Sequence, residues 1–253
     1  MKRLAVLILT TALLLVACAT TPTGRRQLML VSEEQAIAAS REAYLSQMKQ
    51  LKDDGKLATD PALIQRIDRI TGRLIAQAIK MRPQTQQWEW SVQVIDDPDT
   101  VNAWCMAGGR MAIYTGLVDQ LKATDDELAQ VMGHEISHAL ANHTAERMSV
   151  AMASSMGVML AGVLSDRPAA TMAGAAAAAT LAIKLPNSRA SESEADRIGI
   201  ELAAKAGYDP KAAATLWQKM GEVGGAGPPQ FLSTHPAPDN RQRTLAELAP
   251  QVV

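Results

Sequence analysis

The stretch VMGHEISHAL, residues 131–140, places His134 and His138 four positions apart, with Glu135 directly after the first histidine. The chain holds only four histidines in 253 residues, so their concentration here calls for an explanation. An α-helix turns by about 100° per residue, which brings both imidazoles to one face, one turn apart. The spacing therefore predicts two ligands for one metal ion.

The same helix has a recognisable beginning. Thr124 and Glu127 have the spacing of a capping box, so we expect a helix from about residue 125 to about residue 148. His143 would then lie on the opposite face and is interpreted as a packing or surface histidine. In the H-E-x-x-H pattern, two neutral imidazoles bind zinc and the glutamate accepts a proton from the attacking water. The alternative is a helix with two incidental histidines.

A catalytic zinc site needs a third protein ligand. The stretch NSRASESEADRIGIEL, residues 187–202, offers Glu192, Glu194 and Asp196 on a predicted helix. Glu192 and Asp196 share a face, whereas Glu194 points elsewhere. We predict Glu192 as the ligand and Asp196 as the residue that orients a ligand histidine. Taken alone, the segment would by default be interpreted as a solvated acidic face, and the upstream histidines favour the metal site.

The residues before the histidine helix predict two helices and a small sheet. Helical signals run from Ser32 to about Leu51, and a second helix begins at Asp60-Pro61. Residues 88–95 alternate as a strand does, and two extended pieces flank Gly108-Gly109, which predicts an antiparallel meander. The expected class is α+β, mostly helical, with a small antiparallel sheet before the active-site helix.

The N-terminus predicts export and lipid attachment. Lys2 and Arg3 precede an uncharged run that is too short to span a bilayer, and small residues stand before Cys18. We expect a lipoprotein signal peptide in residues 1–17, lipidation at Cys18, a tether in residues 18–30 and one metallopeptidase domain in residues 31–253. An ordinary signal or an anchor helix is the alternative. The predicted location is the periplasmic face of the outer membrane.

Residues 150–184 are rich in Ala, Gly and Met and almost free of charge, which predicts a helical hairpin. The hairpin is interpreted as a pair of close-packed helices, and contact with a membrane is the alternative. The net charge is −1 and there is no basic patch, so no nucleic-acid partner is expected. After processing at Cys18, Cys105 would be the only thiol, which excludes an internal disulfide.

The motifs HEISH and, some 55 residues later, SRASESEAD resemble the gluzincin peptidases. The likeness is to the family of the HtpX heat-shock protease, the CAAX-prenyl endopeptidase and the BepA-type assembly proteases. It extends from about Trp88 to Arg243 and includes NAW and STHPAP. The resemblance implies one Zn²⁺ per chain, held by His134, His138 and Glu192, and it implies metalloendopeptidase activity. HtpX-like members carry membrane helices around the core, and this chain has only the short Ala-rich pair.

Further site residues follow from the resemblance. Asn102 and Ala103, in NAW, resemble the strand beside the cleft, where an edge strand pairs with substrate backbone. His235 matches a late His-Pro and is expected either to stabilise the oxyanion or to bind zinc as a fourth ligand; a structural loop histidine is the alternative. Arg241 is expected as a second polar contact to substrate near His235.

The sequence thus predicts a zinc endopeptidase that cuts unfolded or misassembled envelope proteins. We predict Glu135 as the general base and Asp196 as the residue that orients a ligand histidine. The alternative function is an outer-membrane assembly chaperone whose zinc site is latched and rarely active, with the assembly machinery as its partner. A purely structural zinc site is disfavoured, because such sites are usually closed by four Cys or His ligands.

Overall fold

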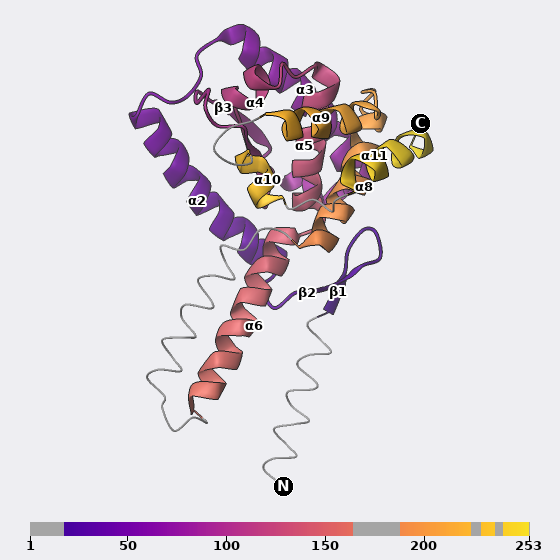
Figure 1. Cartoon of the computed structure of the whole chain (residues 1–253). Helices are drawn as coiled ribbons and strands as arrows, with labels where there is room; N and C mark the ends of the chain where they lie inside the picture. The colour runs from indigo at the N-terminus through magenta and orange to yellow at the C-terminus, as the bar shows by residue number, and fades with distance from the viewer. Residues whose placement is uncertain (1–17, 164–187, 224–228, 236–239, 253) are drawn as a thin grey trace. The chain divides into compact units, whose positions relative to one another are not determined.

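A computed structural model describes residues 18–163, 188–223, 229–235 and 240–252 (Figure 1). The predicted signal peptide and residues 164–184 of the predicted hairpin lie outside this range. Contacts divide the chain into two units, Met1–Ala36 with Asn142–Leu185, and Ile37–Ala141 with Pro186–Val253. The sequence did not predict this division. Among the described residues, no helix is both long and apolar enough to cross a membrane.

The first unit contains a two-stranded antiparallel sheet of β1 (Cys18–Thr20) and β2 (Arg26–Leu28), followed by the start of α2 (Glu33–Asp53). Residues 18–30, expected as a tether, are therefore partly in strands. The unit also contains α6 (His143–Val163), where Glu146 accepts two hydrogen bonds from Arg25, at 2.7 and 2.6 Å. The predicted start of α2 is confirmed, because Ser32 and Gln35 exchange the two bonds of a capping box.

The second unit is built around α5 (Asp125–Leu140), which is almost entirely buried. Its other elements, in chain order, are α3 (Pro61–Met81), η1 (Pro83–Gln87), β3 (Ser91–Ile95), β4 (Ala103–Cys105), β5 (Arg110–Tyr114), α4 (Thr115–Gln120), α8 (Arg189–Lys205), α9 (Ala212–Glu222), α10 (Gln230–Thr234), α11 (Arg241–Leu248) and η2 (Ala249–Gln251). Helices α3, α8 and α9 all pack against α5. Apolar residues of α3, including Ile67, Ile70 and Leu74, are fully buried in the core, as their spacing predicted.

The sheet of this unit is mixed, so the expectation of an antiparallel meander is wrong. The strand order is β3-β5-β4, with β3 parallel to β5 and β4 antiparallel to β5. β5 returns from the turn at Gly108 and Gly109, both at positive φ, and inserts between its two predecessors. Alternating side chains indicate which residues form a strand but carry no information on strand order, which explains the error.

The predicted helix of residues 125–148 is in fact two helices. α5 starts as predicted with a complete Thr124–Glu127 capping box, but it ends at Leu140. Asn142 follows with φ 57°, a left-handed conformation that asparagine tolerates at a helix end, and α6 then begins in the other unit. His143 is buried and belongs to that unit, so it does not share the helix face that carries His134 and His138.

Candidate metal centre

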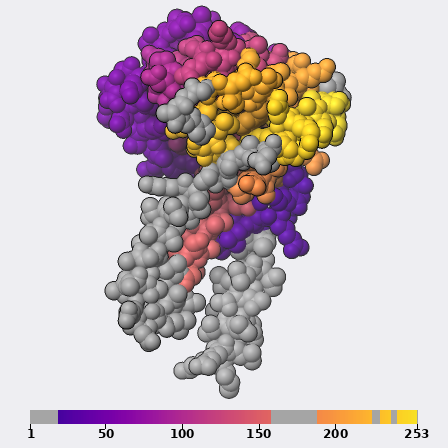
Figure 2. Space-filling model, in the orientation of Figure 1, coloured from indigo at the N-terminus to yellow at the C-terminus, as the bar shows by residue number. Residues whose placement is uncertain are grey.

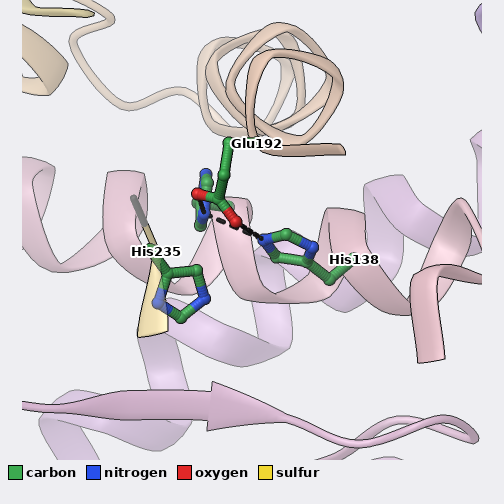
Figure 3. Close-up of side chains that lie close together, drawn as sticks. His138, Glu192 and His235 are labelled. Carbon is green, nitrogen blue, oxygen red and sulfur yellow. Dashed lines mark hydrogen bonds and ion pairs between the residues drawn. The ribbon is translucent and has the colours of Figure 1, made fainter. Parts of the chain in front are cut away.

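Four side chains converge beside the middle of α5. Ligand atoms of His134, His138, Glu192 and His235 all lie within 4.8 Å of one another, and all four residues are buried. The close-up shows Glu192, from the helix above, pointing toward His138, with His235 on the other side of the carboxylate (Figure 3). Helix spacing in α5 supplies the first two, α8 supplies the third, and the end of α10 supplies the fourth.

The distances in this cluster suit a cation better than they suit the protein alone. Nε2 of His134 lies 3.0 Å from Nε2 of His138, and two neutral imidazoles that face each other in this way share at most one hydrogen. Each nitrogen also lies 3.4 Å from a different oxygen of Glu192. The buried Oε1 of Glu192 has no hydrogen-bond partner among the described residues. Two imidazoles and one carboxylate are a ligand set that zinc prefers.

Asp196 accepts a hydrogen bond from Nδ1 of His134, the ring nitrogen that faces away from Glu192. Its Oδ1 lies 3.0 Å from Nδ1 of His134 and accepts the hydrogen on that nitrogen. Nε2 is then left with its lone pair directed toward the other ligands, which is the tautomer a metal requires. The two acidic residues of α8 thus differ in position as the sequence predicted, Glu192 inside the cluster and Asp196 behind it.

The charges of the cluster shift the pKa values of its members. Burial alone would lower the pKa of His134, but hydrogen bonds to Asp196 and Glu192 outweigh it and raise the pKa to about 9. Without a metal this ring therefore carries a second proton near pH 7, and the ring becomes neutral when a metal displaces that proton. For Glu192, burial would raise the pKa, yet the bond and charge of His134 lower it to about 2. Burial and the nearby His134 lower the pKa of His235 to about 3. His235 is therefore neutral near pH 7, with a ring nitrogen available as a ligand.

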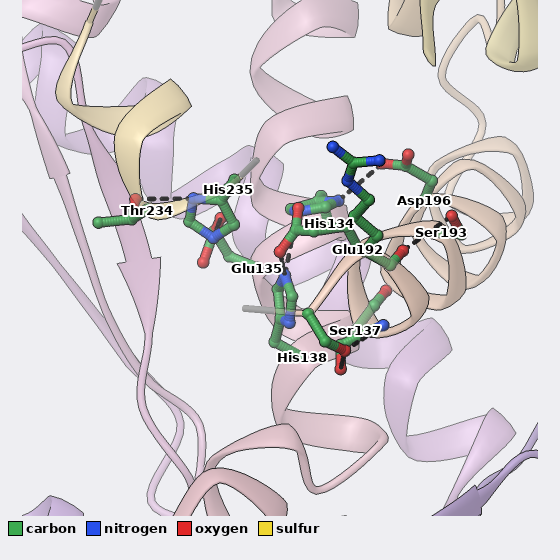
Figure 4. A network of polar contacts seen from close by, with 12 residues as sticks. His134, Glu135, Ser137, His138, Glu192, Ser193, Asp196, Thr234 and His235 are labelled. Atoms are coloured by element: carbon green, nitrogen blue, oxygen red, sulfur yellow. Dashed lines mark hydrogen bonds and ion pairs between the residues drawn. The ribbon is translucent and has the colours of Figure 1, made fainter. Parts of the chain in front are cut away.

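Glu135 and His235 face each other beside the cluster. Nε2 of His235 lies 3.3 Å from Oε1 of Glu135, and its Nδ1 lies within hydrogen-bonding distance of the Thr234 hydroxyl and the Phe231 carbonyl (Figure 4). The backbone N–H of Phe231 donates to the carbonyl of Val101, which ties α10 to the chain just before β4. This bond brings His235 to the metal residues.

β4 is at the edge of the described three-stranded sheet, and it packs against α5. Asn102 and Ala103 at its start are buried, and the side chain of Asn102 accepts a hydrogen bond from the N–H of Ala103 at 3.0 Å. The carbonyl of Asn102 accepts from Tyr114 of the neighbouring strand. β4 therefore packs against the helix that carries His134 and His138, and the backbone N–H of Ala103 is already satisfied by the side chain of Asn102.

Several residues that build the site were not found from the sequence. Trp217 and Phe231 pack beside His134, with ring centroids 6.3 and 6.1 Å from it, and no motif marks them. Gly133 and Gly199 let α5 and α8 touch: a Cβ on Gly199 would lie 2.8 Å from the backbone nitrogen of His134. Glycine inside a helix costs stability, so these two positions did carry a signal of close packing.

Arg241, expected as a substrate contact, is buried and lies behind the ligands. Its guanidinium donates to Glu192 and to Asp196. In the space-filling view, the orange and yellow residues of the C-terminal helices lie next to each other on the surface of the second unit (Figure 2). The arginine thus belongs to the buried support of the site.

Comparisons with known proteins agree with this geometry. Residues 57–249 match the profile described as peptidase family M48. The mitochondrial metalloendopeptidase OMA1 of Arabidopsis thaliana is 36% identical over 85% of this chain and 42% of its own length, and its Homo sapiens counterpart is 33% identical over 91% and 45%. The β-barrel assembly-enhancing protease of Escherichia coli is 28% identical over 77% and 40%. The chain thus spans less than half the length of these three relatives.

Proposed function

Since the chain belongs to peptidase family M48, we propose that it is a zinc-dependent endopeptidase acting on unfolded or misassembled proteins of the cell envelope. The observation that carries this proposal is the convergence of His134, His138 and Glu192 next to Glu135. A structural zinc site would have no use for a carboxylate at that position.

The residues divide the work of hydrolysis. Zinc, when bound, polarises the peptide carbonyl and makes water a better nucleophile near neutral pH. Glu135, on the same helix turn as the ligands, accepts the proton of the attacking water and passes it to the leaving amine. Asp196 keeps His134 in the required tautomer by accepting the hydrogen of its Nδ1. His235, neutral and adjacent to Glu135, is a candidate donor to the developing oxyanion.

The edge strand β4 supports a peptide substrate. An extended segment that pairs with a sheet edge is recognised through its backbone, with little dependence on side chains. Such segments are exposed in unfolded and misassembled proteins, which is why we propose them as substrates. The similarity to the Escherichia coli β-barrel assembly-enhancing protease supports an envelope role.

Location at the periplasmic face of the outer membrane, through a lipid at Cys18, is part of the proposal. The charged start, the uncharged run and the small residues before Cys18 support it. Expression of wild type and Cys18→Ser in a bacterial host tests it. We expect wild type in the membrane fraction with an acylated N-terminal peptide, and the variant released; an unacylated wild type contradicts lipid attachment.

The central test is cleavage of casein by the purified protein. We expect cleavage that a chelator stops and that Glu135→Gln reduces by about 10²-fold or more while zinc is retained. Unchanged cleavage by Glu135→Gln contradicts the assigned mechanism. Retention of zinc separates the loss of the base from the loss of the metal.

A second candidate function is an assembly chaperone with a latched zinc site, and one observation favours it. His235 lies within ligand distance of the same cluster, so it is placed to close the position that a substrate needs. In His235→Ala we expect faster casein cleavage if His235 is a latch, and strongly reduced cleavage if it stabilises the transition state. Thr234→Ala removes the hydroxyl that lies 2.9 Å from Nδ1 of His235, so it should change cleavage in the same direction as His235→Ala and by a smaller factor.

A further inference from the structure

Arg241 opens α11, and its side chain is 4% exposed although it carries a full charge. A buried charge is costly unless it is paired and hydrogen-bonded. Here the guanidinium reaches three other helices: it contacts α8 through two carboxylates, α5 through His134 and α9 through Trp217. Arg241 therefore links the C-terminal helix to both helices that carry the predicted metal ligands.

One arm of the guanidinium fixes the ligand carboxylate. Nη1 of Arg241 donates to Oε2 of Glu192 at 3.1 Å. The other oxygen, Oε1, has no hydrogen-bond partner among the described residues and lies 3.4 Å from Nε2 of His138. The bond to Arg241 thus holds the carboxylate with one oxygen anchored and the other directed into the ligand cluster.

The second arm fixes the orienting carboxylate. Nη2 of Arg241 donates to Oδ1 of Asp196, the same oxygen that accepts from Nδ1 of His134. Glu192 and Asp196 are four residues apart on one helix, where like charges repel. A cation that bonds to both of them offsets this repulsion, and it does so whether or not the metal is bound.

Trp217 fixes the plane of the guanidinium. The central carbon of Arg241 lies 3.6 Å from the centroid of the Trp217 ring, which is stacking distance. The buried Nε has no hydrogen-bond partner among the described residues, so the fork is oriented by the ring and the two carboxylates. Lysine has neither the planar fork nor the stacking surface, so it cannot reproduce this arrangement.

We propose that Arg241 is a positioning residue of the metal site: it holds Glu192 and Asp196 in their ligand and orienting geometry before the metal binds. With Glu135, the site contains three carboxylates, and the charges of Arg241 and one divalent cation together balance them. The role differs from the substrate contact expected from the sequence, because both terminal nitrogens are already bonded to the protein. The inference rests on the zinc site of the proposed function, but metal binding alone tests it.

The test compares zinc affinity in Arg241→Lys and Arg241→Gln with wild type, by competition with a chromophoric chelator. Arg243→Lys and Arg243→Gln are matched controls, since Arg243 lies on the same helix with its side chain 73% exposed. We expect both Arg241 variants to bind zinc about 10- to 100-fold more weakly, the range for removal of a group that orients a ligand. The Arg243 variants should bind as wild type does.

Other outcomes overturn the proposal. If Arg241→Lys equals wild type and Arg241→Gln binds more tightly, the arginine acts only as a charge. If zinc affinity is unchanged and only KM for casein rises, it contacts substrate. If both variants fail to fold without zinc, as judged by circular dichroism, it serves the fold. A protein that binds zinc as expected but cleaves nothing would contradict the proposed function and leave this inference standing.

Discussion

Two buried acidic clusters lie along α5, and they differ in how completely their hydrogen bonds are satisfied. At the start of the helix, Glu127 closes the capping box with Thr124, accepts from Thr215 at 2.9 Å and pairs with Lys219 at 2.7 Å. In the middle, Glu192 faces two imidazole nitrogens, and one of its oxygens has no hydrogen-bond partner in the described chain.

The difference indicates the function of each cluster. A buried carboxylate whose acceptors are all used ties elements together, here α5 to α9, and stabilises the fold. A buried carboxylate oxygen without a hydrogen-bond partner, beside two imidazole nitrogens that also face it, is arranged to bind a metal cation. The comparison predicts that substitutions at the two clusters will have separable effects, one on metal binding and the other on stability.

The largest expected effect is in the middle cluster. Glu192→Ala removes a ligand, so zinc affinity should fall by more than the roughly 10²-fold limit for residues that only orient ligands. Metal content after dialysis against a zinc buffer measures it. Glu194→Ala, two residues away on α8, is the control and should retain zinc; zinc lost from this variant and kept by Glu192→Ala would move the ligand by two residues.

A smaller effect is expected where α5 and α8 touch. In Gly199→Ala the new Cβ would lie 2.8 Å from the backbone nitrogen of His134, and backbone cannot move aside as a side chain can. The free energy of unfolding should fall by about 3 kcal/mol, the upper range for overpacking. Thermal and urea unfolding measure it.

Gly72→Ala is the matched control, because a Cβ there meets nothing within 4 Å. It should stabilise α3 by about 0.5–1 kcal/mol. Zinc affinity should fall in Gly199→Ala and stay unchanged in Gly72→Ala. Equal stability of the two variants would contradict the close contact of α5 and α8.

At the start of α5 we expect a substitution to change the free energy of unfolding without changing the affinity for zinc. Glu127→Gln keeps the shape but loses the charge opposite Lys219, which should cost about 1.5 kcal/mol in the free energy of unfolding. Urea unfolding and zinc titration of the same sample measure both quantities. A variant with wild-type stability and weakened zinc binding would reverse the roles of the two clusters.

The smallest expected effect is the loss, at low pH, of the stabilisation that Glu127 provides. Burial raises the pKa of Glu127, but bonds from Lys219, Thr124 and Thr215 outweigh it and hold the pKa below its ordinary value of 4.5. The stabilisation is therefore complete above pH 4.5 and is lost as the pH falls through the lowered pKa. The stability difference between wild type and Glu127→Gln should shrink below pH 4.5; a constant difference would contradict the lowered pKa.

The metal ligands were predictable because their pattern is local. His134 and His138 are one turn apart, and Glu192 and Asp196 are four residues apart, so helix geometry alone relates each pair. The capping residues Thr124 and Ser32 fixed two helix starts for the same reason. These features depend on neighbours in sequence, which a single chain reveals.

Features that depend on tertiary contacts were not predictable. The insertion of β5 between β3 and β4, and the stacking of Arg241 on Trp217, join segments whose pairing no local pattern encodes. Asn142 follows the end of α5 with a left-handed backbone, which asparagine tolerates, so this helix end does have a local sequence signal. The direction of the Arg241 side chain likewise follows from its partners and not from its motif.

Gly133 and Gly199 contact each other through their main chains, and this contact limits how closely α5 and α8 can approach. Side-chain rotamers cannot widen or narrow a gap that backbone atoms define. The shortest distance between the backbones that carry His134 and Glu192 is then set by the main chain at these two glycines.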